Sequence, residues 1–393
     1  LFWLRPPRHV AEQAEPLKLS EEQTKHATPA PGHHRLRGAA GSGKTLVLAY
    51  RAARLASEGK RVLILTYNIT LWHYVHDAIQ RAPFIFDWKR ITVVHFHGFC
   101  KDILNHYGVD WPEGEREEVF QRGVVAAVLQ AIEGKQHELW DAVLIDEGQD
   151  YCVEWYWMLR RFLTDHNELV LVCDAMQNIY GRDDSWTDRP MKGVAFRGPW
   201  GELRRSYRLP NEVASLARRF GQLFGLDQRT SVEDAQTELE FRPHVVWCEI
   251  EDRRLEEWLW RAFTRLKKEG EHASDMVFLL PNHEIGMRCA QHFEKQGISV
   301  NHVFEIDGPR TTKRHKVAFW NQDSRVKMST VHSFKGWECA NVVLYIGTSP
   351  HRACHTNDML VYTAITRTRG NLIVLNANPR YKEFGESLPC KWE

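Results

Sequence analysis

The sequence predicts an α/β protein of two lobes, each containing a parallel β-sheet flanked by helices. Short apolar runs alternate with segments of helical periodicity in both halves of the chain, which is typical of doubly wound sheets. A length of 393 residues suits two domains better than a single core. The turn-rich stretch 181–200 separates the two halves. We therefore expect an extended lead-in over residues 1–18, a first lobe over 19–200 and a second over 201–393.

The apolar runs have the character of strands buried on both faces of a sheet. The strands expected in the first half are 35–37, 61–67, 91–95, 142–146 and 169–173, with helices over 44–58 and 154–164. Those expected in the second half are strands 245–250, 276–280, 298–302, 326–331, 342–345 and 372–375, with helices over 211–224, 253–268, 284–296 and 358–368.

Composition excludes several classes of protein. With 43% apolar and 26% charged residues, the chain is neither disordered, collagen-like nor a coiled coil. Lys and Arg total 52 against 51 for Asp and Glu, so nucleic-acid contacts have to come from local basic and aromatic patches. Eight scattered cysteines without a Cys-x-x-Cys pair indicate no zinc ribbon or disulfide framework, and a reducing cytoplasm fits best. No apolar run is long enough to cross a membrane, so no membrane partner is expected.

Residues 38–45 match the phosphate-binding pattern G-x-x-x-x-G-K-[ST] at every position. Small residues allow successive backbone N–H groups to surround the phosphates, and the helix that follows adds its positive dipole end. Lys44 is expected to reach the β- and γ-phosphates of ATP, and Thr45 to ligate Mg²⁺. The immediate start of a long helical pattern argues against an incidental glycine-rich turn. The expected phosphate-binding residues are Gly38, Ala39, Ala40, Gly41, Ser42, Gly43, Lys44 and Thr45.

An acidic pair ends the apolar run 142–145. Asp146 is placed to hold Mg²⁺ through water, and Glu147 to orient or deprotonate the attacking water. A charged strand end that is merely solvated is the simpler interpretation. It is disfavoured because the pair lies about one hundred residues after Lys44 in the same lobe.

The ordered motifs resemble those of superfamily 1 helicases of the UvrD/Rep type. Asp146 to Asp150 (DEGQD) resembles motif II, and Cys173 to Tyr180 (CDAMQNIY) resembles motif III. The further matches are Leu19–Gln23 with the Q motif, Thr66–Asn68 and Val94–His97 with motifs that touch single-stranded DNA, Ser206–Arg208 with motif IV, Thr330–Glu338 with motif V and Tyr362–Arg369 with motif VI. The resemblance covers residues 19–375 and implies two RecA-like P-loop NTPase lobes.

The resemblance also implies roles for individual residues. Gln23 would recognise adenine, Tyr207 would stack on it, and Glu338 would bind the ribose. Gln177 would sense the γ-phosphate, while Arg208 and Arg367 would neutralise charge on the transferring phosphoryl group. Positioned cations stabilise a loose phosphoryl transition state, and an arginine finger is worth roughly 10³–10⁵ in rate. The expected catalytic residues are Lys44, Asp146, Glu147, Gln177, Arg208 and Arg367.

The partner implied by the resemblance is single-stranded DNA, with RNA left open because stacking and phosphate contacts do not distinguish the two. Bases stack on aromatic side chains for roughly 1–3 kcal/mol each. The residues expected to contact nucleic acid are Tyr67, Asn68, Phe96, His97, Tyr180, Thr330 and His332, and Trp186 is a further aromatic candidate. Taken alone, each aromatic residue is better explained as a core or surface residue, and the match to the family motifs reverses this for Tyr67, Tyr180 and His332.

The chain departs from the family in size and in detail. The large insertions that grip duplex DNA in relatives are missing or reduced to a stub at 107–134, which favours a translocase core with limited unwinding. Cys173 stands where glycine is usual, and Gly148 stands where alanine is usual. The chain opens at Leu1 without an initiator Met, and we expect an upstream nuclease-like domain or a partner protein to complete it.

Several functions share these motifs. The favoured one is an ATP-dependent translocase or helicase on single-stranded DNA, with the 3′→5′ direction implied by the family alone. An ATP-gated switch that binds nucleic acid in order to signal has the same motifs. A small-molecule phosphotransferase is disfavoured by the matches to motifs V and VI, and a pseudo-ATPase by the intact catalytic residues.

Overall fold

The computed structural model describes residues 16–68, 71–114, 119–174, 177, 179, 185–187, 196, 198–207, 209–226, 245–304, 323–348 and 354–388. The chain separates into two compact units. Pro16–Gly38 with Gly43–Leu203 forms the first unit, and the second contains Ala39–Ser42 and the chain from Arg204 onward. We call them the first and second lobes.

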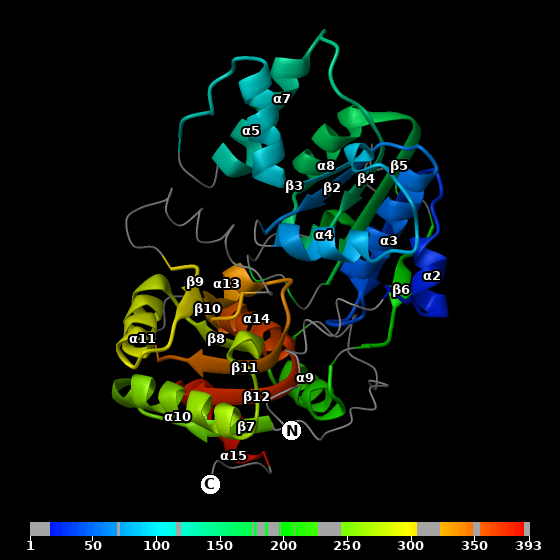
Figure 1. Cartoon of the computed structure of the whole chain (residues 1–393). Coiled ribbons are helices and arrows are strands. Elements are labelled where there is room, and N and C mark those ends of the chain that lie inside the picture. Colours follow the sequence, from blue (N-terminus) through cyan, green and yellow to red (C-terminus); the bar gives the residue numbers. More distant parts are fainter. Residues whose placement is uncertain are drawn as a thin grey trace. The chain divides into compact units, whose positions relative to one another are not determined.

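The first lobe is built on a six-stranded parallel sheet with strand order β3-β2-β4-β5-β1-β6. Figure 1 shows the helices on both sides of this sheet. The elements are α2 (Glu21–Ala27), β1 (Gly32–Gly38), α3 (Lys44–Ser57), β2 (Val62–Thr66), α4 (Trp72–Gln80), η3 (Trp88–Arg90), β3 (Ile91–His95), α5 (Phe96–His106), the π-helix η4 (Val119–Gly123), α7 (Val124–Ile132), β4 (Trp140–Ile145), η5 (Gly148–Asp150), α8 (Val153–Leu159), η6 (Arg160–Phe162), β5 (Leu163–Cys173), η8 (Ser185–Thr187) and β6 (Gly201–Leu203).

Alternation along the buried strands divides the core of the first lobe into two layers. Leu63 and Leu65 of β2 pack with α5, α7 and α8, whereas Val62 and Ile64 pack with α3 and α4. Successive side chains of a strand point to opposite faces, so a strand that is apolar throughout supplies both layers. This explains why continuous apolar runs, rather than alternating ones, predicted these strands.

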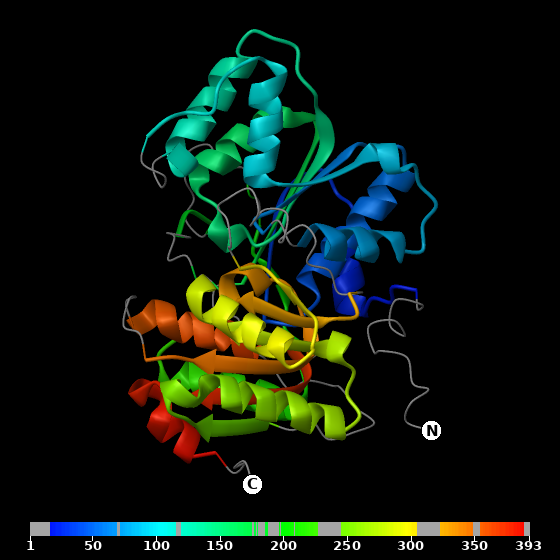
Figure 2. The same ribbon diagram turned by 60° about the vertical axis from the view of Figure 1, so that its left-hand side comes forward.

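The second lobe contains another six-stranded parallel sheet, with order β7-β12-β11-β8-β10-β9. Helices α10 and α11 lie side by side in Figure 2, and α9 packs against α14. The elements are α9 (Asn211–Leu223), β7 (Val245–Glu249), η10 (Asp252–Arg254), α10 (Leu255–Lys268), η11 (Ala273–Asp275), β8 (Met276–Leu280), α11 (His283–Lys295), β9 (Val300–His302), β10 (Val326–Thr330), α13 (Val331–Phe334), β11 (Cys339–Ile346), α14 (Cys354–Ile365), β12 (Thr368–Asn376), η12 (Pro379–Tyr381) and α15 (Lys382–Glu386).

The two parallel sheets flanked by helices confirm the predicted fold class and agree with two RecA-like P-loop lobes. Several details differ from expectation, among them the unpredicted helices α4, α5 and α7 and the helix expected over 358–368, which ends at Ile365 because β12 begins at Thr368. The helix expected over 154–164 ends at Leu159, and a short 3₁₀ turn leads into a strand that starts at Leu163. Strand β6, which the sequence did not predict, pairs with β1 at the edge of the first sheet. Over the described part of the chain, each helix is too short or too polar to cross a bilayer.

Candidate nucleotide site

The phosphate-binding loop joins the end of β1 to the start of α3. Strand β1 ends at Gly38, and α3 begins at Lys44 and continues to Ser57. Gly41 and Gly43 have φ angles of 73° and 84°, in the left-handed region that glycine adopts without a Cβ penalty. The loop therefore requires glycine at these two positions. It places the N–H groups of the first helical turn where they can bind an anion.

The Lys44 ammonium lies across the loop. Its Nζ donates a hydrogen bond to the Gly38 carbonyl at 2.8 Å and forms an ion pair with Asp174 Oδ2 at 3.2 Å. Asp174 follows β5 directly and is buried. In this arrangement the Asp174 carboxylate pairs with the ammonium group that the sequence predicts to bind phosphate. A bound nucleotide would therefore compete with Asp174 for Lys44.

Thr45 and Asp146 come together as predicted for a metal site. The Thr45 hydroxyl donates to Asp146 Oδ2 at 2.8 Å, which joins the start of α3 to the end of β4. Oxygen ligands of this kind suit Mg²⁺, so the pair fits the expected cofactor. Burial, followed by the neighbouring charge of Glu147, raises the pKa of Asp146 to about 7. A cation at this position would favour the ionised carboxylate.

Glu147 is held by a neighbour that the sequence analysis did not select. Its backbone has a left-handed φ of 55°, which is unusual for a residue other than glycine and is often found at functional sites. The Gln149 amide donates to Glu147 Oε2 at 2.6 Å, and Gln149 Oε1 accepts from the Asp174 N–H at 2.9 Å. Gln149 is fully buried. It therefore bridges the segments that follow β4 and β5.

Gln177 extends this network. Its Nε2 donates to Asp174 Oδ2 at 2.7 Å, and its side chain is buried. Gln149 and Asp174 were both missed as site residues. The signal available was their polarity directly after buried strands, inside the same motifs that supplied Glu147 and Gln177.

Gln23 lies against the loop. A Cβ on Gly43 would be 2.4 Å from Gln23 Nε2, so the side chain reaches the glycine that precedes Lys44. Its Oε1 accepts from the Ser20 N–H at 3.0 Å in a capping box at the start of α2. The side chain is fixed beside the loop, and its predicted contact with adenine remains a prediction.

The remaining nucleotide residues belong to the second lobe. The Tyr207 N–H donates to the Gly41 carbonyl at 3.1 Å, within the same compact unit. Glu338 is half-buried just before β11. Arg367 is buried, and its Nε donates to the Thr363 carbonyl at 3.1 Å. The predicted roles of these three residues stay predictions, and Arg208 lies outside the described residues.

The aromatic residues expected to contact nucleic acid do not share one environment. Tyr67 and His97 are half-buried, with their ring centroids 6.3 Å apart. Phe96 is fully buried and stacks on Trp155 at 3.8 Å, so it is a core residue and not an exposed platform for a base. Trp186 is also buried, and its indole N–H donates to the Tyr151 carbonyl.

Three further residues complete the predicted nucleic-acid set. Asn68 is half-buried after β2, and its carbonyl accepts from the Thr66 hydroxyl. Thr330 caps α13 by accepting the Ser333 N–H at 3.2 Å, and half-buried His332 lies within that helix. Tyr180 lies outside the described residues.

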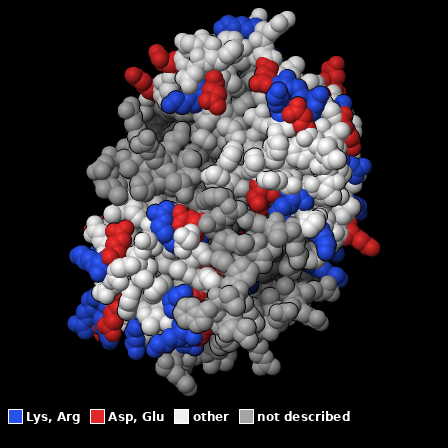
Figure 3. All heavy atoms as spheres, viewed as in Figure 1, with Lys and Arg blue, Asp and Glu red and all other residues white. Residues whose placement is uncertain are grey.

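Surface charge agrees with the composition. Figure 3 shows Lys and Arg lying next to Asp and Glu on the face drawn, instead of gathering into a region of one sign. On α10 and α11, ion pairs such as Arg265–Glu269 and Arg288–Glu256 account for this mixture. Bulk charge therefore gives no strong attraction to a polyanion.

Comparison with known proteins supports the assignment of the first lobe. A protein-family model described as an AAA domain matches residues 24–183, which contain the phosphate loop, the acidic pair and Gln177. The match supports a P-loop, helicase-like superfamily and suggests an ATPase that acts with nucleic acid. No curated protein matches the chain.

Proposed function

We propose that the chain is an ATP-dependent translocase or helicase on single-stranded DNA. The observation that carries the proposal is the continuous buried network at the carboxyl ends of three neighbouring strands. Lys44 follows β1, Asp146 and Glu147 follow β4, and Asp174 follows β5. Such a network supplies the cation, metal ligand and base that phosphoryl transfer requires.

Each residue has a distinct task in hydrolysis. Lys44 would bind the β- and γ-phosphates, Thr45 and Asp146 would hold Mg²⁺, and Glu147 would orient the attacking water and accept its proton. The chemistry that Mg²⁺ would supply there is positive charge against the phosphates. Arg208 and Arg367 stabilise the charge that develops on the transferring group, as the family resemblance implies.

Nucleic acid would be held by half-buried aromatic and polar side chains from both lobes. Tyr67, Asn68 and His97 follow or lie near strands of the first sheet, and His332 follows β10 in the second. The carboxyl ends of parallel strands lie at one edge of a sheet, where ligands of α/β folds bind. The 3′→5′ direction rests on the resemblance alone.

The second candidate is an ATP-gated nucleic-acid switch, or a motor module of a larger protein without unwinding of its own, and the compact size bears on the latter. The segment between α5 and β4 holds one π-turn and the single α-helix α7 in its described part. A small insertion favours a motor module with limited unwinding that an upstream nuclease-like domain or partner completes, in repair or defence.

A displacement assay separates these candidates. Streptavidin bound to either end of a biotinylated single strand is challenged with the chain and ATP. A translocase removes it from the 5′ end in an ATP-dependent reaction, whereas a switch leaves it in place at both ends. Processive unwinding of long duplexes by the isolated chain would contradict the limited-unwinding part of the proposal.

A further inference from the structure

The second lobe contains a cavity that none of the assigned nucleotide residues explains. Its volume is about 690 Å³, within the range of roughly 300–1,000 Å³ typical of small-molecule sites. It is lined by residues at the carboxyl ends of β8 and β11, including Pro281 and Ile346. These two strands are neighbours in the sheet. The strand that follows β8 in the chain, β9, lies toward one edge of the sheet, whereas β12, which follows β11, lies toward the other edge. Such a switch point is where open α/β sheets bind ligands.

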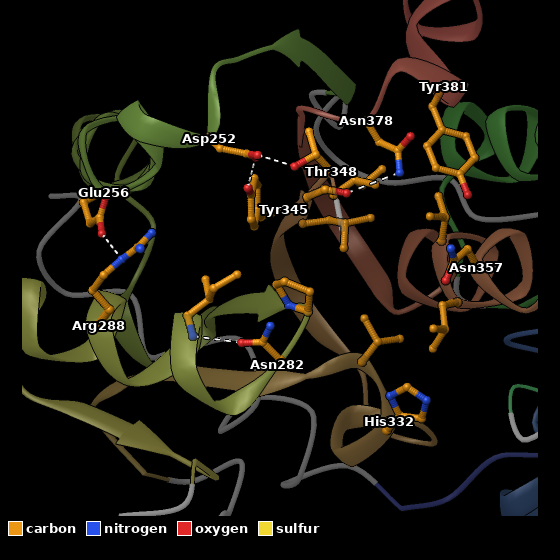
Figure 4. Close-up of a pocket in the computed structure, with 18 of the residues that line it drawn as sticks. Asp252, Glu256, Asn282, Arg288, His332, Tyr345, Thr348, Asn357, Asn378 and Tyr381 are labelled. Atoms are coloured by element: carbon orange, nitrogen blue, oxygen red, sulfur yellow. Dashed lines mark hydrogen bonds and ion pairs between the residues drawn. The ribbon is translucent and has the colours of Figure 1, made fainter. Parts of the chain in front are cut away.

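A carboxylate lies on one side of this cavity. Asp252 accepts hydrogen bonds from the hydroxyls of Tyr345 and Thr348, one on each of its oxygens. Figure 4 shows these three residues together on one side, with Asn282 and His332 on the other. Each carboxylate oxygen can accept more than one hydrogen bond. Asp252 is therefore oriented by its two hydroxyl partners and retains the capacity to accept donors from a ligand.

The rest of the lining limits the class of ligand. Apolar side chains form much of the wall, among them Ile285, Leu344 and Leu360. The two arginines in the lining are each paired with a carboxylate, Arg253 with Glu251 and Arg288 with Glu256. These carboxylates offset the charge of the two arginines, so the cavity has little net attraction for a phosphate. The cavity suits a group that has apolar faces and carries N–H donors for Asp252.

We propose that this cavity seats a nucleobase and that Asp252 selects guanine. Guanine presents N1–H and an exocyclic amino group side by side, and two parallel N–H groups match the two oxygens of a carboxylate. The apolar wall would pack against the base faces, while phosphates stay outside. His332, already proposed to contact single-stranded DNA, also lines this cavity, so a base in the cavity could belong to the bound DNA strand. The inference rests on the proposed function for the claim that the base belongs to a strand.

The test compares guanine with hypoxanthine, which lacks only the 2-amino group. Strands of thymidine carrying spaced guanines, or hypoxanthines at the same positions, are titrated into the full chain and followed by fluorescence anisotropy. We expect roughly ten-fold tighter binding of the guanine strand. Asp252→Asn should remove that preference, whereas Glu294→Gln, an exposed carboxylate on α11, should keep it. Leu360→Trp fills the cavity and should also remove it, with circular dichroism checking that both variants fold.

Free guanosine and inosine distinguish a base in a strand from a free nucleoside. Their binding is measured by ligand-observed NMR in the presence of excess ADP and Mg²⁺, which occupy the nucleotide site. One outcome is that no DNA strand binds, whereas guanosine binds and its binding is lost in Asp252→Asn. The proposed function then fails, while the cavity remains a nucleoside site. Equal affinity for guanine and hypoxanthine, or a preference that survives both Asp252→Asn and Leu360→Trp, overturns the cavity assignment.

Discussion

Gln149 shows how one buried amide can tie the catalytic carboxylate to the rest of the site. Its side chain contacts Glu147 on one side and the Asp174 backbone on the other. Asp174 in turn contacts Lys44 and Gln177. A displacement of Gln149 would therefore affect the positions of Glu147, Lys44 and Gln177 together.

Replacing Gln149 with leucine keeps the volume but removes both hydrogen bonds. We expect Gln149→Leu to lower kcat by up to about 10²-fold, because a small misplacement of the base is costly. KM for ATP should change by only a few-fold, since Lys44 and the loop are retained. Steady-state ATPase kinetics measure the split, with the exposed Gln130→Leu as control. A loss confined to KM would contradict the positioning role.

Gly148 and Cys173, two positions that differ from the pattern of the helicases this sequence resembles, lie next to each other. A Cβ on Gly148 would lie 2.4 Å from Leu171 Cδ1 and 2.9 Å from Cys173 Sγ. Glycine at position 148 thus leaves the space that Leu171 and, next to it, Cys173 occupy. The sequence showed both substitutions, but only the neighbouring position of β4 and β5 shows that they belong together.

This coupling predicts a non-additive pair. Gly148→Ala should destabilise the first lobe by about 1–3 kcal/mol through overpacking. Combining it with Cys173→Gly should recover part of that loss, because the sulfur is removed. Chemical denaturation of both single variants and of the double variant completes the cycle. Strict additivity would mean that the two positions are independent.

At the scale of elements, a buried ion pair joins α3 to β5. Arg51 Nε lies 2.6 Å from Glu168 Oε1, and both side chains are buried. Burial lowers the pKa of Arg51, although the charge of Glu168 opposes this effect. The Arg51 guanidinium also donates to the His26 carbonyl at the end of α2. One side chain therefore connects the helix after the phosphate loop with the helix before it and with the central sheet.

Removing Arg51 leaves the buried Glu168 carboxylate without its guanidinium and with the His166 ring 3.3 Å from its other oxygen. Arg51→Ala is expected to lower the free energy of unfolding by about 3–5 kcal/mol. The control is Arg54→Ala on the same helix, where the exposed pair with Glu58 is worth about 0.3–0.5 kcal/mol. Urea unfolding compares the two variants, and similar losses would contradict the structural role of the buried pair.

Helices and strands were predictable where the residues of the segment itself indicate the structure. They were less predictable where pairing with a neighbouring strand determines it. The runs at β2 and β3 are short and rich in apolar, mostly β-branched residues, so their strands were predicted to within one residue or so at each end. Residues 163–168 are mostly polar, yet they extend β5 because Leu163 pairs with Trp140 and Thr164 donates to Asp141. The sequence around them carries no strand signal.

The same distinction applies to the candidate site. The phosphate loop and the acidic pair are short segments whose chemistry can be predicted from adjacent residues. Phe96 was expected to meet a base, but Trp155, far away in the sequence, stacks on it. A contact between two segments that are distant in the sequence cannot be predicted from either segment alone.

At the scale of the whole molecule, the proposed function assigns Arg367 of the second lobe a role in ATP hydrolysis. Arg367→Ala should leave nucleotide affinity within a few-fold and lower kcat roughly 10³-fold or more, because its charge acts chiefly in the transition state. Nucleotide binding by calorimetry and turnover by phosphate release separate the two effects. Equal losses of binding and rate would assign Arg367 to ground-state binding.

The most direct test of the central claim is steady-state ATP hydrolysis with and without single-stranded DNA, repeated with RNA and duplex DNA. The account predicts strong stimulation by single-stranded DNA, and loss of all hydrolysis in Lys44→Ala. Stimulation would establish that nucleic-acid binding and the nucleotide site are coupled. Hydrolysis that no polymer accelerates would contradict a DNA-driven motor, and near-normal turnover in Lys44→Ala would contradict the nucleotide site itself.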